Sequence, residues 1–148
     1  MKQGFVKVAA ASCAVAVADV RENTRVILET IHKMEDEGAK VMVLPELALT
    51  GYTCSDLFWQ SQMIDAAKEG LKEIADGTKG TDALIFVGLP WEQGGKLFNV
   101  AAVLCHGELL GVVPKKYLPN YNEFYELRHF TPGKEAVTTT EFFGKEVP

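Results

Sequence analysis

The stretch Val41-Met42-Val43-Leu44 is a short, wholly apolar run, and Pro45 and Glu46 follow it directly. A run of this kind is typical of a strand in a mostly parallel sheet that is covered on both faces. Ligands of open α/β sheets bind at the carboxyl ends of the strands. The sequence therefore predicts a buried strand that delivers the Glu46 carboxylate, partly withdrawn from water, to a functional edge of the sheet.

The residues before this run predict a strand and an amphipathic helix. Phe5–Val17 is rich in Val and Ala and predicts another buried strand. Asp19 is placed to cap a helix, Glu22 completes a capping-box pattern, and Gly38 is a good helix stop. The apolar residues that recur at helical spacing between them are Ile27, Ile31 and Met34.

The residues after the run complete an α/β order. Pro45–Phe58 has no periodicity and predicts a loop, and Ile64–Gly77 predicts a second amphipathic helix. Three apolar stretches separated by turn residues then predict strands over residues 84–89, 97–105 and 109–113. The order β-α-β-α-β-β-β predicts an α/β fold with a mixed sheet and helices on one face.

The C-terminal part follows no such pattern. Pro114–Glu126 is aromatic, charged and non-periodic, and Thr131–Pro148 shows no clear core of its own. Two half-formed strands are an unusual end for a domain. We therefore expect residues 1–148 to be part of a larger domain.

Composition excludes several classes of function. The chain has 148 residues, 47% of them hydrophobic, and a formal net charge of −5. We expect no nucleic-acid partner, because phosphate binding needs a basic stripe, and no membrane span, because no apolar run reaches about 18 residues. Three cysteines without metal-type spacing and three isolated histidines predict reduced thiols in the cytoplasm and no metal site.

Lys115 is the second candidate site residue, after Glu46. It also follows an apolar strand, and Pro114 restricts the backbone just before it. A lysine at this place can stabilise an oxyanion or hold a carboxylate ionised. The alternatives are ordinary ones: a solvated lysine beside Lys116, and a Glu46 that caps a helix or pairs with a surface lysine.

Glu123 and Glu126 lie among the aromatic residues Tyr121, Phe124 and Tyr125. Their spacing of three residues places both carboxylates within one turn of any helix formed there. The alternative is an aromatic packing segment with solvated acids.

The cysteines offer no obvious nucleophile. Cys54 has no histidine near it in the sequence, whereas a reactive thiolate needs an electropositive partner. Cys13 and Cys105 lie inside apolar runs and should be inert packing residues.

Together these motifs resemble the nitrilase, or carbon–nitrogen hydrolase, superfamily. Its signature is a Glu at a strand end, a Lys after a later strand and a Cys after a further one. The first two match LPE at residues 44–46 and KKYLP at residues 115–119. Longer runs resemble the glutaminase domains of glutamine-dependent NAD synthetases: VAAAS at 8–12, PELALTGYTCSDLF at 45–58 and LPNYNEFYE at 118–126.

The resemblance implies a fold and a site. The fold is a nitrilase-like α-β-β-α sandwich, of which residues 1–148 supply only the first part. Glu46 would be the general base and Lys115 the oxyanion stabiliser. Glu126, or alternatively Glu123, would be the second glutamate. Further residues implied in the glutamine pocket are Tyr52, Tyr121, Glu123 and Phe124.

It also implies parts that this sequence does not contain. The family's nucleophilic Cys lies well beyond the Lys motif, and no cysteine follows Cys105 here. The expected activity is glutamine hydrolysis that feeds ammonia to a synthetase domain, which would use ATP and magnesium to amidate nicotinate adenine dinucleotide. Self-assembly into homo-oligomers is expected too. The alternatives are a stand-alone amidase for another small amide and a non-catalytic protein of this fold.

Two structural expectations follow. Glu46 and Lys115 should lie on neighbouring strands and converge at one sheet edge, ideally within about 3 Å. One face of the sheet should remain apolar and uncovered, because only the first part of a two-sheet sandwich is encoded.

Overall fold

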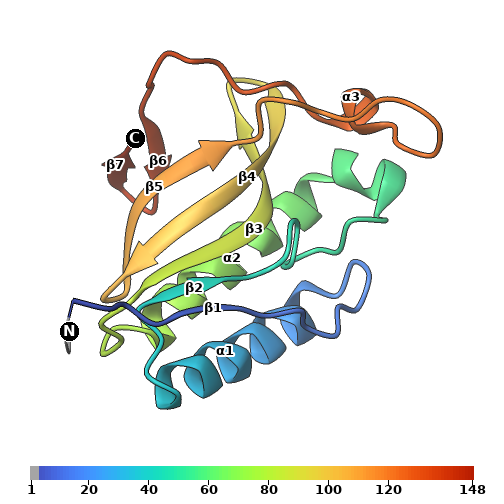
Figure 1. Cartoon of the computed structure of the whole chain (residues 1–148). Helices are drawn as coiled ribbons and strands as arrows, with labels where there is room; N and C mark the ends of the chain where they lie inside the picture. Colours follow the sequence, from blue (N-terminus) through green and yellow to red (C-terminus); the bar gives the residue numbers. More distant parts are fainter. Residues whose placement is uncertain (1–3) are drawn as a thin grey trace.

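The computed structural model describes residues 4–148, with a five-stranded mixed sheet at the centre (Figure 1). The strands lie in sequence order: β1 (Val8–Ala10), β2 (Val41–Val43), β3 (Leu84–Gln93), β4 (Lys96–Cys105) and β5 (Glu108–Pro114). β1, β2 and β3 are parallel, whereas β3, β4 and β5 form an antiparallel meander. The chains of β2, β3 and β5 therefore run in the same direction, and their carboxyl ends lie at the same edge of the sheet.

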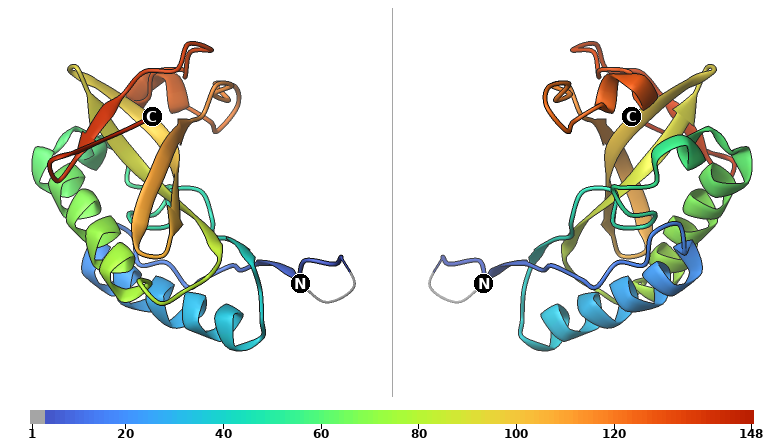
Figure 2. Two further views of the ribbon diagram at one scale, coloured as in Figure 1. Left: turned by 90° about the vertical axis from the view of Figure 1, so that its left-hand side faces the viewer. Right: turned by 90° about the vertical axis from the view of Figure 1, so that its right-hand side faces the viewer.

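Two helices cover one face of this sheet, as predicted (Figure 2). They are α1 (Val20–Asp36) and α2 (Ser61–Gly77). The Asp19 side chain accepts a hydrogen bond from the Glu22 amide at 3.0 Å, and Gly38 follows α1 with φ +83°. The buried apolar residues of the helices are Ile27, Ile31 and Met34 in α1 and Met63, Ile64, Ala67, Leu71, Ile74 and Ala75 in α2.

The opposite face is open and apolar, as expected for the first part of a two-sheet sandwich, and this corrects two of the local predictions. Phe5–Val17 forms only the three-residue strand β1, whose Val8 is exposed, so it is not a buried strand. β2 buries Met42 on the helix side, but Val43 on the other side is 43% exposed. The reason is topological: right-handed crossovers that step in one direction along a sheet place their helices on the same face.

The segments outside this core form short elements. The predicted loop after β2 contains the 3-10 helix η1 (Ser55–Trp59), and the segment after β5 contains α3 (Glu126–His129). β6 (Thr140–Phe142) and β7 (Lys145–Val147) form a hairpin beside β5.

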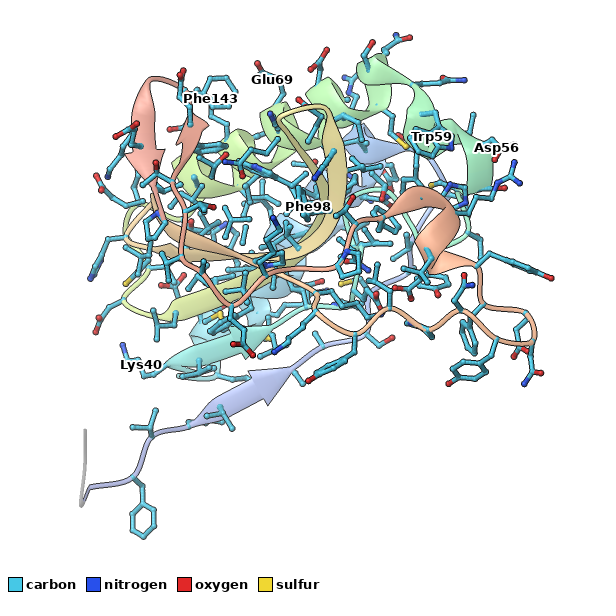
Figure 3. The ribbon with its side chains drawn as sticks, turned by 90° about the horizontal axis from the view of Figure 1, so that it is seen from above. Lys40, Asp56, Trp59, Glu69, Phe98 and Phe143 are labelled. Atoms are coloured by element: carbon cyan, nitrogen blue, oxygen red, sulfur yellow. The ribbon has the colours of Figure 1, made fainter. Side chains whose placement is uncertain are left out.

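That hairpin packs more closely than the sequence suggested. Val147 is buried in the main core, and the Trp91 indole donates to Thr140 Oγ1 at 3.0 Å. In Figure 3 the labelled Phe143 of this hairpin lies near α2, and Lys72 of α2 lies over its ring at 5.6 Å from the ring centre.

Candidate active site

Glu46 is carried across β3 by the turn that follows β2. The Leu44 amide donates to Phe86 O at 3.0 Å and the Leu49 amide donates to Gly88 O at 3.2 Å, so the residues between them pass over β3. A Cβ atom on Gly88 would lie 2.4 Å from Pro45 O. Only glycine leaves room for this crossing, which brings Glu46 toward β4 and β5.

Lys115 meets Glu46 at this edge of the sheet. Its backbone amide donates to Asn99 O at 2.7 Å, which continues the β4–β5 pairing by one residue. Its Nζ donates to Glu46 Oε1 at 2.7 Å. The predicted convergence is therefore present.

The prediction that the two residues lie on neighbouring strands is wrong. β3 and β4 separate β2 from β5. The side chains still meet because β2 and β5 run in the same direction and because the turn at Glu46 crosses β3 over Gly88.

Glu126 completes the charge cluster. Its Oε1 atom accepts hydrogen bonds from Lys115 Nζ at 2.9 Å and from the Tyr52 hydroxyl at 2.7 Å. The Glu126 side chain is only 4% exposed, and its Oε2 atom is buried with no hydrogen-bond partner among residues 4–148. This second oxygen is therefore shielded from solvent and unpaired within the described residues.

The helix α3 that carries Glu126 is held against η1. Arg128 pairs with Asp56 at 2.9 Å, and the His129 ring lies 6.1 Å from the Trp59 ring. Figure 3 shows Asp56 and Trp59 beside α3, at the end of the molecule away from Lys40. The loop after β2 thus supports Glu126 as well as supplying Glu46.

The cluster keeps Lys115 charged. Burial lowers the pKa of Lys115, but the hydrogen bonds and charges of Glu46 and Glu126 more than offset this, so the pKa is raised above its ordinary value. Burial, the hydrogen bond to Glu126 and the carboxylate charges raise the pKa of Tyr52 well above its usual range. Lys115 is therefore an ammonium and Tyr52 a neutral hydrogen-bond donor near pH 7.

Glu46 itself is more open to water than predicted. Its side chain is 41% exposed, because it lies on the face of the sheet that no helix covers. A cleft of about 560 Å³ opens on this face. Its floor is apolar, with Val43, Phe86 and Val113, and one end holds Glu46 and Lys115.

The structure separates the other predicted site residues into two groups. Tyr52 joins the cluster through Glu126. Tyr121 and Phe124 instead pack on each other, with ring centres 5.6 Å apart, and Tyr121 is exposed. Glu123 is also exposed, and within residues 4–148 no hydrogen bond joins it to the cluster. Roles for these three in substrate binding stay predictions.

Cys54 has the features of a structural residue. It is buried, and its Sγ donates to Thr50 O at 3.0 Å. Burial raises the pKa of its thiol, which disfavours the nucleophilic thiolate. Cys13 and Cys105 are free thiols, partly buried.

Asn99 is the site residue that sequence reasoning missed. It is 3% exposed and lies in β4, where its side-chain Nδ2 donates to Glu46 Oε1. The available signal was a polar residue inside the apolar stretch from Leu97 to Cys105.

Neither a metal-binding group of side chains nor a membrane-spanning helix is found among residues 4–148. In that range no group of three or more His, Cys, Asp and Glu side chains could hold a metal ion. Nor does any helix in that range have the length and apolar character needed to cross a membrane.

Known relatives are similar in sequence to most or nearly all of this chain. The glutamine-dependent NAD(+) synthetase of Mycobacterium tuberculosis is 35% identical over 146 residues, which are 99% of this chain and 22% of that relative. The corresponding synthetase of Aquifex aeolicus is 36% identical over 121 residues, which are 82% of this chain and 21% of that relative. The chain thus spans about a fifth of the length of these relatives.

Solved structures agree. The crystal structure of a glutamine-dependent NAD(+) synthetase from Cytophaga hutchinsonii matches with a TM-score of 0.91 at 29% identity, over 97% of this chain and 24% of that one. An amidase from Nesterenkonia sp. matches in fold, with a TM-score of 0.75 at 23% identity, over 99% of this chain and 55% of the amidase. The family model for carbon-nitrogen hydrolases matches residues 7–145, and the chain belongs to this family.

Proposed function

We propose that this chain is the N-terminal part of a glutaminase domain, which in a longer protein hydrolyses the side-chain amide of glutamine. The ammonia would serve the ATP-dependent amidation of nicotinate adenine dinucleotide to NAD. The main support for the proposal is that Lys115 forms ion pairs with both Glu46 and Glu126. In addition, the chain is similar along its length to glutamine-dependent NAD synthetases.

Amide hydrolysis by this route needs a nucleophile, a proton shuttle and an oxyanion donor. Glu46 accepts the proton of an attacking thiol, and the sulfur forms a bond to the amide carbon. The Lys115 ammonium stabilises the resulting oxyanion. The carbon–nitrogen bond then breaks, and the nitrogen leaves as ammonia with the proton that Glu46 returns. Water then attacks the thioester, with Glu46 again as base; the carbon–sulfur bond breaks, the sulfur takes back the proton from Glu46, and glutamate is released.

Glu126 has two functions in this proposal. Its Oε1 atom positions Lys115, because it accepts from Nζ at 2.9 Å. We assign to its buried Oε2 atom, which has no protein partner among residues 4–148, a hydrogen bond from a bound water molecule. An acceptor left unpaired in a buried site is costly unless a ligand satisfies it.

The nucleophile is assigned to sequence beyond Pro148. Cys54, the cysteine nearest in sequence to the Glu46 motif, is bonded to Thr50 O and has a raised pKa. We assign ATP and magnesium to the synthetase part of the longer protein.

We further propose a cytoplasmic, homo-oligomeric protein. The free thiols of Cys13, Cys54 and Cys105 suit a reducing compartment. Homo-oligomerisation is what the family resemblance implies; the apolar face with the exposed Val8, Val43 and Val113 is instead the surface that the rest of the domain would cover.

The test is a substrate comparison on the longer protein. Release of ammonia is measured with glutamine, asparagine and simple aliphatic amides, and NAD formation is followed with glutamine or free ammonia as the nitrogen source. We expect glutamine to be the preferred amide and to support NAD formation. Preference for a simple amide, without NAD formation, would instead favour a stand-alone amidase.

A further inference from the structure

Asn99 occupies a place in the fold where an apolar residue would be expected. It pairs with Pro90 of β3 and lies between Phe98 and Val100 in β4. Its side chain is on the open face, because it contacts Glu46, whereas the neighbouring Val100 is in the main core. Burying a polar side chain in a strand costs free energy unless it makes hydrogen bonds.

This residue contacts both partners of the central ion pair. Its backbone oxygen accepts from the Lys115 amide at 2.7 Å, and its side-chain Nδ2 donates to Glu46 Oε1. Glu46 Oε1 is also the atom that accepts from Lys115 Nζ. Asn99, a buried residue of β4, therefore fixes both the backbone at the start of the lysine motif and the direction of the Glu46 carboxylate.

Solvation of Glu46 does not require this contact. The Glu46 side chain is 41% exposed, so water could satisfy its oxygens in the absence of Asn99. Asn99 and Lys115 both donate to Oε1, which restrains the carboxylate, and within residues 4–148 no hydrogen bond is made to its other oxygen, Oε2. A general base must be held in place with a free oxygen that can accept a proton.

We propose that Asn99 is a positioning residue for the glutaminase reaction: it anchors Glu46 through Oε1 and thereby presents Oε2 to the attacking thiol. This inference rests on the proposed function. In this proposal Asn99 does not contact the substrate. Removal of its side chain should therefore slow the chemical step and leave glutamine binding nearly unchanged.

The test uses the longer protein with two substitutions at one site and one control. Asn99→Ala removes the donor. Asn99→Asp keeps the shape but, when ionised, only accepts and so repels Glu46. Val100→Ala is the matched control, because it removes buried side-chain volume from the adjacent residue on the helix-covered face.

We expect N99A to lower kcat for glutamine by roughly 10- to 100-fold with KM within about threefold, since small misplacement of a reacting group has effects of this size. N99D should be slower than N99A, and V100A should keep kcat within about twofold. A kcat of N99A within twofold of the wild type, or N99D as active as the wild type, would overturn the proposal.

A spectroscopic readout separates this inference from the proposed function. In protein labelled with ¹³C at glutamate Cδ, the Glu46 resonance is assigned by its absence in Glu46→Gln. It should move in N99A and stay in place in V100A. Lack of glutamine turnover by the wild type would reject the proposed function. An unmoved Glu46 resonance in N99A would reject the positioning role, whatever the substrate.

Discussion

The two faces of the five-stranded sheet are made by alternating residues of the same strands. Met42 and Ile85 lie on the face covered by α1 and α2 and are fully buried. Val43 and Val113 lie on the other face and are exposed, and there the strand ends bring Glu46 and Lys115 together. One face therefore holds the fold together and the other carries the chemistry, so substitutions on the two faces should have separable effects.

The largest effect should come from the charge cluster itself. In the longer protein, Lys115→Met should lower glutamine kcat/KM by about 10³-fold or more, because oxyanion stabilisation is lost. Glu46→Gln should do the same by removing the base. The matched control is Lys116→Met, which removes the neighbouring lysine that pairs with Glu135 at the surface. Equal losses for Lys115 and Lys116 would show that the cluster is not the site.

On the covered face the expected loss is in stability. Ile85→Ala should lower the free energy of unfolding by about 2–5 kcal/mol, because it leaves a cavity between the sheet and the helices. Val43→Ala, on the open face, should cost less than about 1 kcal/mol. Urea denaturation of both variants of the 148-residue chain measures the difference. Similar costs would mean that both faces are covered in solution.

A substitution at Gly88 tests whether the turn that carries Glu46 crosses β3 as described. In Gly88→Ala the new methyl group would lie 2.4 Å from Pro45 O and 2.5 Å from Leu47 N, so the turn that carries Glu46 must move. We expect turnover of the longer protein to fall by roughly 10- to 100-fold, as for other small misplacements. Gly80→Ala is the control, since nothing lies within 4 Å of its Cβ. Unchanged turnover in G88A would contradict the crossing.

The smallest effect is expected at Cys54. Cys54→Ser retains a donor for Thr50 O and should leave glutaminase turnover within a few-fold of the wild type. Complete loss of activity in a folded C54S protein would show that the nucleophile has been misassigned.

Local patterns predicted much of this molecule. The cap at Asp19, the stop at Gly38 and the helix and strand order follow from nearest-neighbour chemistry and periodicity, and each is present. The strand ends also placed Glu46 and Lys115 at one edge. Glu126 was preferred over Glu123 through a family resemblance, and the structure brings Glu126 to Lys115.

The remaining features depend on tertiary arrangement. An apolar run such as Val41–Leu44 does not by itself show that one face is open, because burial depends on layers outside the run; only the family resemblance predicted the uncovered face. The crossing over Gly88 requires the close approach of two segments far apart in sequence. Asn99 and Glu46 are 53 residues apart in the sequence. The one sequence feature that indicated their contact is a polar residue, Asn99, inside an otherwise apolar strand.

The most direct test of the account is an assay for ammonia and glutamate release by the mass-verified 148-residue chain, beside the longer protein. We predict turnover by the longer protein and none by the 148-residue chain. The chain retains Glu46, Lys115 and Glu126, but its one cysteine close in sequence to Glu46, Cys54, is buried with a raised pKa. Turnover by the 148-residue chain comparable with that of the longer protein would contradict the assignment of the nucleophile to sequence beyond Pro148.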